Sequence, residues 1–157
     1  MRTEAQPRYR ITIAEGPDVT IASVTAEVDL ETVGAHVQAA FGTLGRTIGE
    51  AGAFGDGPPG LIVHEMDRGS MTVEVFMPIA RSFTPSPGVE IRTLPGGRVA
   101  TTLHQGPYDG LGAAYQSVTA WIADHRLVST GPPRERYLND PHVAGTVPRT
   151  RIEFPVA

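Results

Sequence analysis

Polar and apolar side chains alternate along several stretches of the chain, which is the pattern of β-strands. Residues 8–14 alternate in polarity, and residues 19–28 are rich in β-branched side chains, so we predict a strand in each. The intervening segment, Gly16-Pro17-Asp18, predicts a turn. The same reasoning predicts further strands at residues 61–67, 70–79, 89–94, 97–105, 134–139 and 149–156.

Two other stretches carry apolar residues at helical spacing and predict α-helices. The first covers residues 31–51, and a glycine-rich loop at 52–60 ends it. The second covers residues 109–126 and is opened by a Gly-Pro-Tyr segment. The predicted order is therefore two strands, a helix and two strands, then a linker at 80–88, then the same order again. This order predicts an α+β protein.

The chain repeats in sequence as well as in predicted structure. When it is shifted by 74 positions, Ala39-Ala40-Phe41 falls on Ala113-Ala114-Tyr115, and Gly57-Pro58-Pro59 falls on Gly131-Pro132-Pro133. One helix-on-sheet unit cannot bury its apolar face alone, so we predict that two copies pack as a pseudo-twofold pair with a ligand cleft at the axis. Residues 1–157 then form a single domain, with repeats at about 8–79 and 89–157.

Composition narrows the class of protein. Of the 157 residues, 40% are hydrophobic and 19% are charged, which is typical of a globular domain. The absence of Cys excludes disulfides, thiolate zinc sites and a cysteine nucleophile. No apolar run approaches the roughly 18 residues of a membrane span and no signal peptide is visible, so we expect a cytoplasmic protein without a membrane partner. The 13 basic residues are all arginine and are scattered, and the net charge is −4, which argues against nucleic acid as a partner.

Most motifs for cofactors are missing or out of place. Residues 55–60, Gly-Asp-Gly-Pro-Pro-Gly, have the spacing of a dinucleotide-binding loop. However, this segment follows a helix and precedes a strand, and its prolines lack the amides that would face a pyrophosphate. The five histidines show no short metal-ligand spacing, so we predict neither a metal site nor a cofactor.

Aromatic residues that can form hydrogen bonds cluster in the second half of the chain. They are Tyr108, Tyr115, Trp121 and Tyr137. Buried Tyr and Trp need partners for their O–H and N–H groups, so the cluster is typical of a cavity with a polar tip. Plain core packing is the alternative for Tyr115, which continues the apolar stripe of its helix. Phe54 is a candidate for the cleft floor in the first half, and it too fits a core position.

The strand at 134–139 carries the candidate functional carboxylate. Period-two alternation puts Glu135 and Tyr137 on one face, and the arginines at 134 and 136 on the other. If the arginines face water, Glu135 and Tyr137 point inward, where the first repeat has the apolar residues Leu61 and Val63. An ionised carboxylate is costly to bury unless it is paired or functional. The alternative is that Glu135 forms a salt bridge with a neighbouring Arg at the sheet edge.

Several motifs in order carry a resemblance: His104-Gln-Gly-Pro-Tyr108-Asp-Gly-Leu111, Ala114-Tyr115, Trp121-Ile122, Gly131-Pro-Pro-Arg-Glu135-Arg-Tyr137-Leu-Asn-Asp-Pro141 and Arg151-Ile-Glu-Phe-Pro-Val156. Together they resemble the GyrI-like small-molecule-binding domain, which is also the effector-binding domain of AraC-type and MerR-type multidrug regulators. The resemblance implies two pseudo-symmetric ββαβ-type repeats that form a curved antiparallel sheet with two helices around a central cleft. It also implies that Tyr108 and Trp121 line this cleft, and that Glu135, beside Tyr137, reaches the ligand.

The resemblance leaves three functions open. The first is a stand-alone protein that captures flat hydrophobic or cationic small molecules, in resistance or detoxification. The second is a hydrolase that opens the cyclopropane ring of DNA-alkylating natural products, with Glu135 as general base and Tyr108 or Tyr137 as acid. The third is a protein-binding topoisomerase inhibitor. A chain of 157 residues has no room for the regulators' helix-turn-helix segment, so we expect no direct DNA binding. The oligomeric state stays open.

Overall fold

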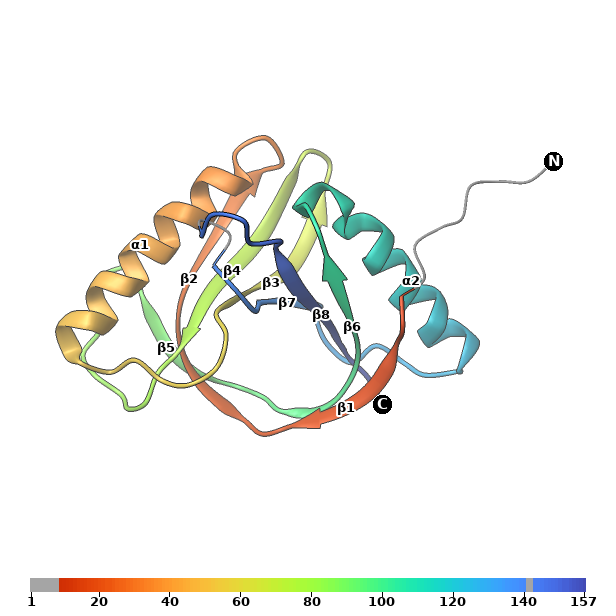
Figure 1. Ribbon diagram of the computed structural model, residues 1–157. Coiled ribbons are helices and arrows are strands. Elements are labelled where there is room, and N and C mark those ends of the chain that lie inside the picture. Colours follow the sequence, from red (N-terminus) through yellow and green to blue (C-terminus); the bar gives the residue numbers. More distant parts are fainter. Residues whose placement is uncertain (1–8, 141–142) are drawn as a thin grey trace.

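An antiparallel sheet of eight strands forms the centre of the molecule, with two α-helices packed on one of its faces (Figure 1). The computed structural model describes residues 9–140 and 143–157. The strands are β1 (Thr12–Gly16), β2 (Val19–Asp29), β3 (Gly60–Asp67), β4 (Ser70–Pro78), β5 (Glu90–Leu94), β6 (Gly97–Gln105), β7 (Arg134–Tyr137) and β8 (Arg149–Pro155). The helices are α1 (Val33–Ala51) and α2 (Leu111–Asp124), and the 3-10 turn η1 (Tyr108–Gly110) directly precedes α2.

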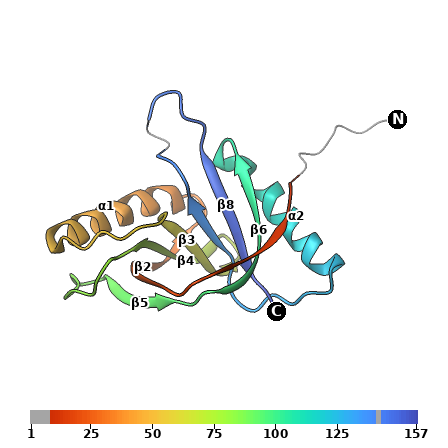
Figure 2. The same cartoon turned by 60° about the horizontal axis from the view of Figure 1, so that its bottom comes forward.

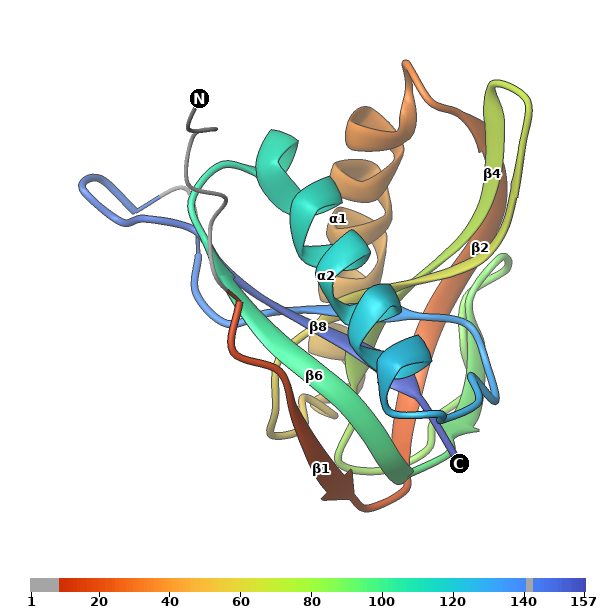
Figure 3. The same cartoon turned by 90° about the vertical axis from the view of Figure 1, so that its right-hand side faces the viewer.

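The sheet consists of two related halves. Its strand order is β1-β6-β8-β7-β3-β4-β2-β5, so β6-β8-β7 on one side of the centre corresponds to β2-β4-β3 on the other. Helix α1 packs on β2 and β4, and α2 packs on β6 and β8. Figure 2 shows the curl of the sheet, and Figure 3 shows α2 in front of α1 on the same side of it. The predicted α+β fold, with two pseudo-symmetric repeats in a curved antiparallel sheet, is confirmed.

The two edge strands are exchanged between the halves. β1 pairs with β6 of the second half, and β5 pairs with β2 of the first. The two connections meet where the Gly96 amide donates a hydrogen bond to Asp18 at 2.7 Å. A Cβ on Gly96 would lie 2.3 Å from the Gly16 carbonyl oxygen, so this close approach requires glycine. The turn predicted at Gly16-Pro17-Asp18 is therefore a crossover between the halves and does not form a hairpin of β1 with β2.

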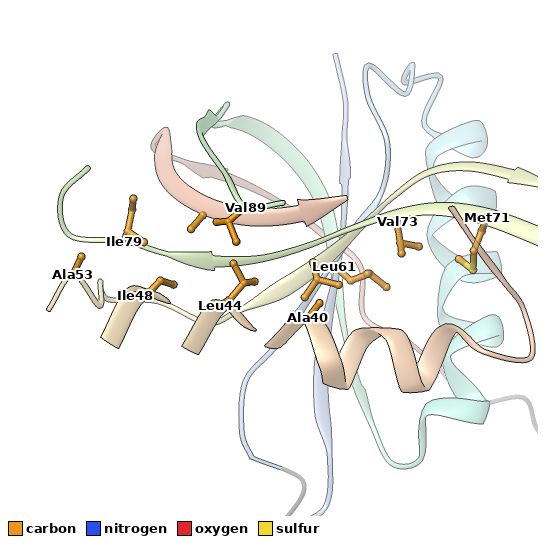
Figure 4. Packing of buried hydrophobic residues seen from close by; sticks show 11 residues of the cluster. Ala40, Leu44, Ile48, Ala53, Leu61, Met71, Val73, Ile79 and Val89 are labelled. Carbon is orange, nitrogen blue, oxygen red and sulfur yellow. The ribbon is translucent and has the colours of Figure 1, made fainter. Parts of the chain in front are cut away.

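The helical stripes that reveal the sequence repeat face the sheet. Equivalent positions of the two helices are buried: Ala40, Leu44 and Ile48 in α1, and Ala114, Val118 and Ile122 in α2. Figure 4 shows the α1 side chains against Leu61 and Val73 of the sheet. The two helices therefore bury matching faces, which is why the shift of 74 positions aligns them.

Some element ends differ from the prediction by a few residues. The helix expected from residue 109 begins at Leu111, and the strand expected at 134–139 ends at Tyr137. Residue 8 of the first predicted strand and Pro141 of the quoted motif lie outside the described residues. In the part of the chain that is described, neither helix combines the length and hydropathy needed to cross a membrane.

Candidate ligand-binding cleft

A cleft of about 1110 Å³ opens between α1, η1 and the central strands. Most of its wall is apolar, and the side chains that form this part include Val33, Val37, Phe41, Leu61, Met71 and Leu111. The polar members include Tyr108, Glu135, Tyr137 and Asn139. A large, mainly apolar pocket with a few polar groups is typical of a site for drug-sized organic molecules.

Glu135 lies at the centre of the cleft floor because of the register of the sheet. In that register, Leu61 of β3 lies directly opposite Glu135 of β7. The same two residues are 74 positions apart, so they are also equivalents in the repeat. The pseudo-twofold axis therefore passes between them. At the axis, the first half supplies an apolar side chain and the second supplies a carboxylate.

The Glu135 carboxylate is buried and is held by two tyrosines. The residue is 7% exposed, and its two oxygens accept hydrogen bonds from Tyr115 of α2 at 2.6 Å and from Tyr137 at 2.7 Å. Burial raises the pKa of Glu135 above its ordinary value, and the two hydrogen bonds oppose that rise. The ion pairs among the described residues involve only the carboxylates of Glu74 and Glu153. The alternative of a salt-bridged Glu135 at the sheet edge is therefore not observed, and β7 is a central strand.

Aromatic rings form the side of the cleft next to Glu135. The Tyr137 ring meets Phe41 of α1 and Tyr108 of η1 edge to face, with ring centroids 6.1 and 6.0 Å apart. Burial, reinforced by the Glu135 charge, raises the pKa of both tyrosine hydroxyls. Both phenols therefore stay protonated at neutral pH, and that of Tyr137 donates a hydrogen bond to Glu135. Tyr108 is 44% exposed, so it lies where the cleft meets solvent.

A buried histidine fixes the turn that carries Tyr108. The Nε2 atom of His104 lies 2.9 Å from the Pro107 carbonyl oxygen, and its Nδ1 atom lies 2.8 Å from the Tyr9 hydroxyl. A carbonyl only accepts, so Nε2 carries the proton, and in the neutral ring Nδ1 accepts from Tyr9. A Cβ on Gly110 would lie 2.9 Å from the His104 ring, so the turn packs tightly on this side chain. The sequence gives no signal for this role beyond the position of His104 in the quoted motif.

Three of the six predicted site residues are absent from the cleft lining: Tyr115, Trp121 and Phe54. Of these, Tyr115 still reaches the site through its hydrogen bond to Glu135. Trp121 of α2 is half-buried against the core cluster of the second half and stacks on His125, with ring centroids 3.9 Å apart. Six residues along a helix correspond to a rotation of about 240°, so Trp121 points away from the side on which Tyr115 reaches Glu135. Phe54 follows α1 and is 54% exposed. We therefore correct the expectation that Trp121 and Phe54 form cleft walls.

Helix α1 contributes more of the cleft than the sequence predicts. Val37 and Phe41 line the cleft, and the Phe41 ring contacts Tyr137, although the candidates from the sequence come almost entirely from the second half. A usable signal exists in the repeat, because Phe41 falls on Tyr115 when the chain is shifted. Within residues 9–140 and 143–157, no three His, Asp or Glu side chains gather as metal ligands. The polar side chains of the cleft are those of Gln38, Tyr108, Glu135, Tyr137, Asn139 and Asp140, and of these Glu135 is hydrogen-bonded to the Tyr137 phenol.

The other face of β7 is buried as well. Arg134 and Arg136 are 7% and 9% exposed, and both donate hydrogen bonds to Glu153 of β8. The condition that these arginines face water, from which the inward direction of Glu135 is argued in the sequence, is therefore not met. The physical reason is that β7 is a central strand and that the sheet face away from the cleft carries a core cluster of its own, Ile21, Ile62, Phe76 and Leu94, beside these arginines. Glu135 points into the cleft nevertheless, because alternate residues of a strand point to opposite faces.

Solved structures share this fold at low sequence identity. The crystal structure of the EcmrR C-terminal domain gives a TM-score of 0.84 at 22% identity and covers 95% of this chain and 98% of that one. EcmrR in the cryo-EM structure of its DNA complex gives a TM-score of 0.83 at 22% identity over 94% of this chain. This chain spans only 57% of that EcmrR chain. A hydrolase from Listeria innocua gives a TM-score of 0.72 at 17% identity and covers 97% of this chain and 94% of its own. SAV2435 bound to tetraphenylphosphonium gives a TM-score of 0.68 at 15% identity and covers 96% of this chain and 94% of its own.

Sequence comparison at the level of families is more specific. A search of curated proteins found no match. A family profile, described as the GyrI-like small molecule binding domain, matches residues 10–157, which include both halves of the sheet, both helices and the cleft. This chain belongs to the GyrI-like small-molecule-binding domain family.

Proposed function

We propose that this protein is a binding module that captures flat or bulky hydrophobic organic cations in its cleft. The observation that carries the proposal is the Glu135 carboxylate, which is 7% exposed at the floor of an apolar cleft and has tyrosine hydroxyls as its partners. No Arg or His of the described residues forms an ion pair with it. A cationic ligand would supply the missing counter-charge, and its apolar groups would fill the wall.

The aromatic rings favour the same class of ligand. Phe41, Tyr108 and Tyr137 present ring faces and edges beside the carboxylate. A delocalised cation gains from an aromatic face as well as from the carboxylate, and it loses little hydration on entering an apolar cleft. In addition, both Glu135 oxygens already accept phenol hydrogen bonds, an arrangement that holds a charge in place. SAV2435, a protein with the same fold, was solved with tetraphenylphosphonium bound, and this cation is therefore a suitable probe.

Calorimetric titration with two probes of one shape tests the proposal. Tetraphenylphosphonium and tetraphenylborate have nearly the same size and opposite charge. We expect the cation to bind and the anion not to bind. In Glu135→Gln, affinity for the cation should fall roughly 10- to 100-fold, the scale of a lost contact to a charged group. Glu50→Gln is the matched control, because Glu50 is exposed on α1 and does not line the cleft.

Two results would count against the proposal. One is equal affinity of the wild-type protein for both probes, which would mean that the cleft reads shape alone. The other is unchanged affinity for the cation in Glu135→Gln together with the fold intact by circular dichroism. Either result would remove the role of the carboxylate as counter-charge.

Hydrolysis on the same cleft is the second candidate function. It is favoured by the raised pKa of Glu135, which moves a carboxylate toward the range of a general base, and by the neutral phenol of Tyr137 within 2.7 Å of it. A hydrolase from Listeria innocua has the same fold, which favours the same candidate. Incubation with a cyclopropane-bearing alkylator followed by mass spectrometry separates the two functions. A product heavier by one water that forms with wild type and not with Glu135→Gln would establish hydrolysis.

A further inference from the structure

A second charged centre lies on the sheet face opposite the cleft. Arg134 and Arg136 of β7 and Arg151 of β8 all converge on one carboxylate, Glu153. The distances from their Nε atoms to the Glu153 oxygens are 3.0, 3.3 and 3.0 Å. β7 therefore serves two centres, because Glu135 belongs to the cleft and its two neighbours in sequence belong to this Arg cluster.

The charges of the Arg cluster do not balance. Three guanidinium groups share one carboxylate, which leaves an excess of two positive charges. Burial lowers the pKa of Arg136, Glu153 opposes this, and the charges of Arg134 and Arg151 lower it further. Each arginine bonds Glu153 through Nε, and the η nitrogens of all three donate no hydrogen bond to another described residue. None of these η nitrogens is among the buried unpartnered atoms of the described residues, so they keep contact with solvent and can donate to a ligand.

A neighbouring cluster on the same face shows what a balanced arrangement looks like. The carboxylate of Glu74 in β4 accepts hydrogen bonds from Arg92 at 2.6 and 2.8 Å, from Ser23 at 2.6 Å and from His64 at 2.8 Å. One permanent cation meets one anion there, and both oxygens are fully engaged. The Arg cluster differs in having two further guanidinium groups, which the stability of Glu153 does not require.

Arg136 is held in place on two sides. Its guanidinium lies over the Phe76 ring, 5.2 Å from the centroid, and its Nε donates to Glu153. Gly60, the partner of Arg136 in the register, makes room for that ring, because a Cβ at Gly60 would lie 2.6 Å from Phe76. The side chain is therefore ordered before any ligand arrives, which lowers the entropic cost of binding. Arg151, whose side chain is 40% exposed, connects the cluster to solvent.

We propose that the Arg cluster of Arg134, Arg136 and Arg151 is a binding site for a doubly charged oxyanion, such as phosphate, sulfate or a phosphate monoester. A dianion matches the excess of two positive charges, and its oxygens accept from the free η nitrogens in the geometry that guanidinium groups favour. The site is separate from the cleft and does not rest on the proposed function of Glu135.

Titration calorimetry with inorganic phosphate tests this site, with sodium chloride added to hold the ionic strength constant. We expect saturable binding of phosphate and of sulfate, and none of nitrate. In Arg151→Gln, affinity for phosphate should fall about tenfold, the scale of one partly exposed charged contact. This variant is chosen because Arg151 is the most exposed of the three and its loss leaves the buried pairs intact. Arg98→Gln is the matched control, because Arg98 is exposed on β6 and its side chain belongs to no ion pair of the described residues.

The outcomes separate a site from a general salt effect. Phosphate and sulfate stabilise most proteins by exclusion from their surface, and that effect does not saturate and is equal in all variants. The proposal is overturned if wild type shows no saturable heat with phosphate, or if Arg151→Gln and wild type bind it equally. Glu135→Gln should bind phosphate like wild type. A loss of phosphate binding in that variant would place the anion in the cleft and would overturn the assignment to the Arg cluster.

Discussion

Glu74 and Glu135 are two buried glutamates for which the structure predicts opposite effects of the same substitution. Glu74 is 2% exposed. Burial alone would raise its pKa, but hydrogen bonds from Arg92, Ser23 and His64 lower it from 4.5 to about 2. Its charged form is therefore stabilised by folding. The pKa of Glu135 is raised by burial, so its charged form is destabilised by folding.

The magnitude for Glu74→Gln follows from linkage. A carboxyl whose pKa falls from 4.5 to about 2 on folding contributes on the order of 3 kcal/mol at pH 7. This contribution is complete above about pH 4.5 and is lost as the pH falls through about 2. At pH 3 less than half of it should remain. For a domain of this size, the loss at pH 7 corresponds to a decrease in Tm of roughly 6–12 °C.

Urea unfolding at pH 7, 4.5 and 3 measures both variants against wild type. We expect Glu74→Gln to be less stable at pH 7 and to approach wild type at pH 3. We expect Glu135→Gln to be at least as stable as wild type at pH 7, because glutamine avoids the cost of a buried charge. Any gain in stability should shrink as the pH falls to 4.5, because Glu135 of the wild type then becomes protonated. The assigned role of Glu74 is contradicted if Glu74→Gln is as stable as wild type at pH 7, or if its loss of stability does not become smaller as the pH is lowered. The opposite prediction for Glu135 is contradicted if Glu135→Gln is the less stable of the two.

Four further substitutions have defined outcomes. Gly60→Ala should destabilise the protein by more than about 3 kcal/mol in thermal unfolding, because its Cβ would lie 2.1 Å from the Glu135 carbonyl oxygen. Gly112→Ala should stabilise the protein by about 0.5–1 kcal/mol, because a Cβ there meets nothing within 4 Å and alanine favours the helix. Tyr115→Phe removes a bond that lowers the pKa of Glu135, so the midpoint of pH-dependent tetraphenylphosphonium binding should move upward in calorimetry. Trp121→Phe should leave the affinity for that cation unchanged within twofold, and a larger loss would return Trp121 to the cleft.

The fold could be predicted because its signals are local and are present twice. Helical spacing and strand alternation each fix one element, and the shift of 74 positions relates one half to the other. The exchange of β1 and β5 could not be predicted in this way. A Gly-Pro-Asp turn signal is the same whether the chain folds back on its neighbour or crosses to the other half, and the choice depends on contacts such as Gly96 against Gly16. The repeat boundaries themselves, at about 80–88, stay a prediction.

The candidate site was predictable only where pattern and register coincide. Glu135 stands out because its repeat equivalent, Leu61, is apolar, and the register then places both residues at the axis. Trp121 was misplaced because clustering in sequence does not fix the direction of a side chain around a helix. The role of His104 cannot be identified from the sequence, because a single histidine without further pattern is enough for it. Its side chain forms a hydrogen bond with the Pro107 carbonyl and so holds the turn that carries Tyr108.

The strand β7 shows most clearly what alternation can and cannot predict. Alternation correctly separates Glu135 from Arg134 and Arg136, but it does not say that one of the two faces must be exposed. Because β7 is central in a curled sheet, both faces are covered, and charged residues of both parities are buried. Such residues persist only with partners, and the partners differ: phenols for Glu135, and the carboxylate of Glu153 for the arginines. A short central strand with charges on both faces therefore predicts two polar centres, one on each face of the sheet. In this protein the centre on the cleft side keeps the negative charge of Glu135, because phenols are neutral partners. The centre on the other face keeps a positive charge, because one carboxylate, Glu153, serves several arginines.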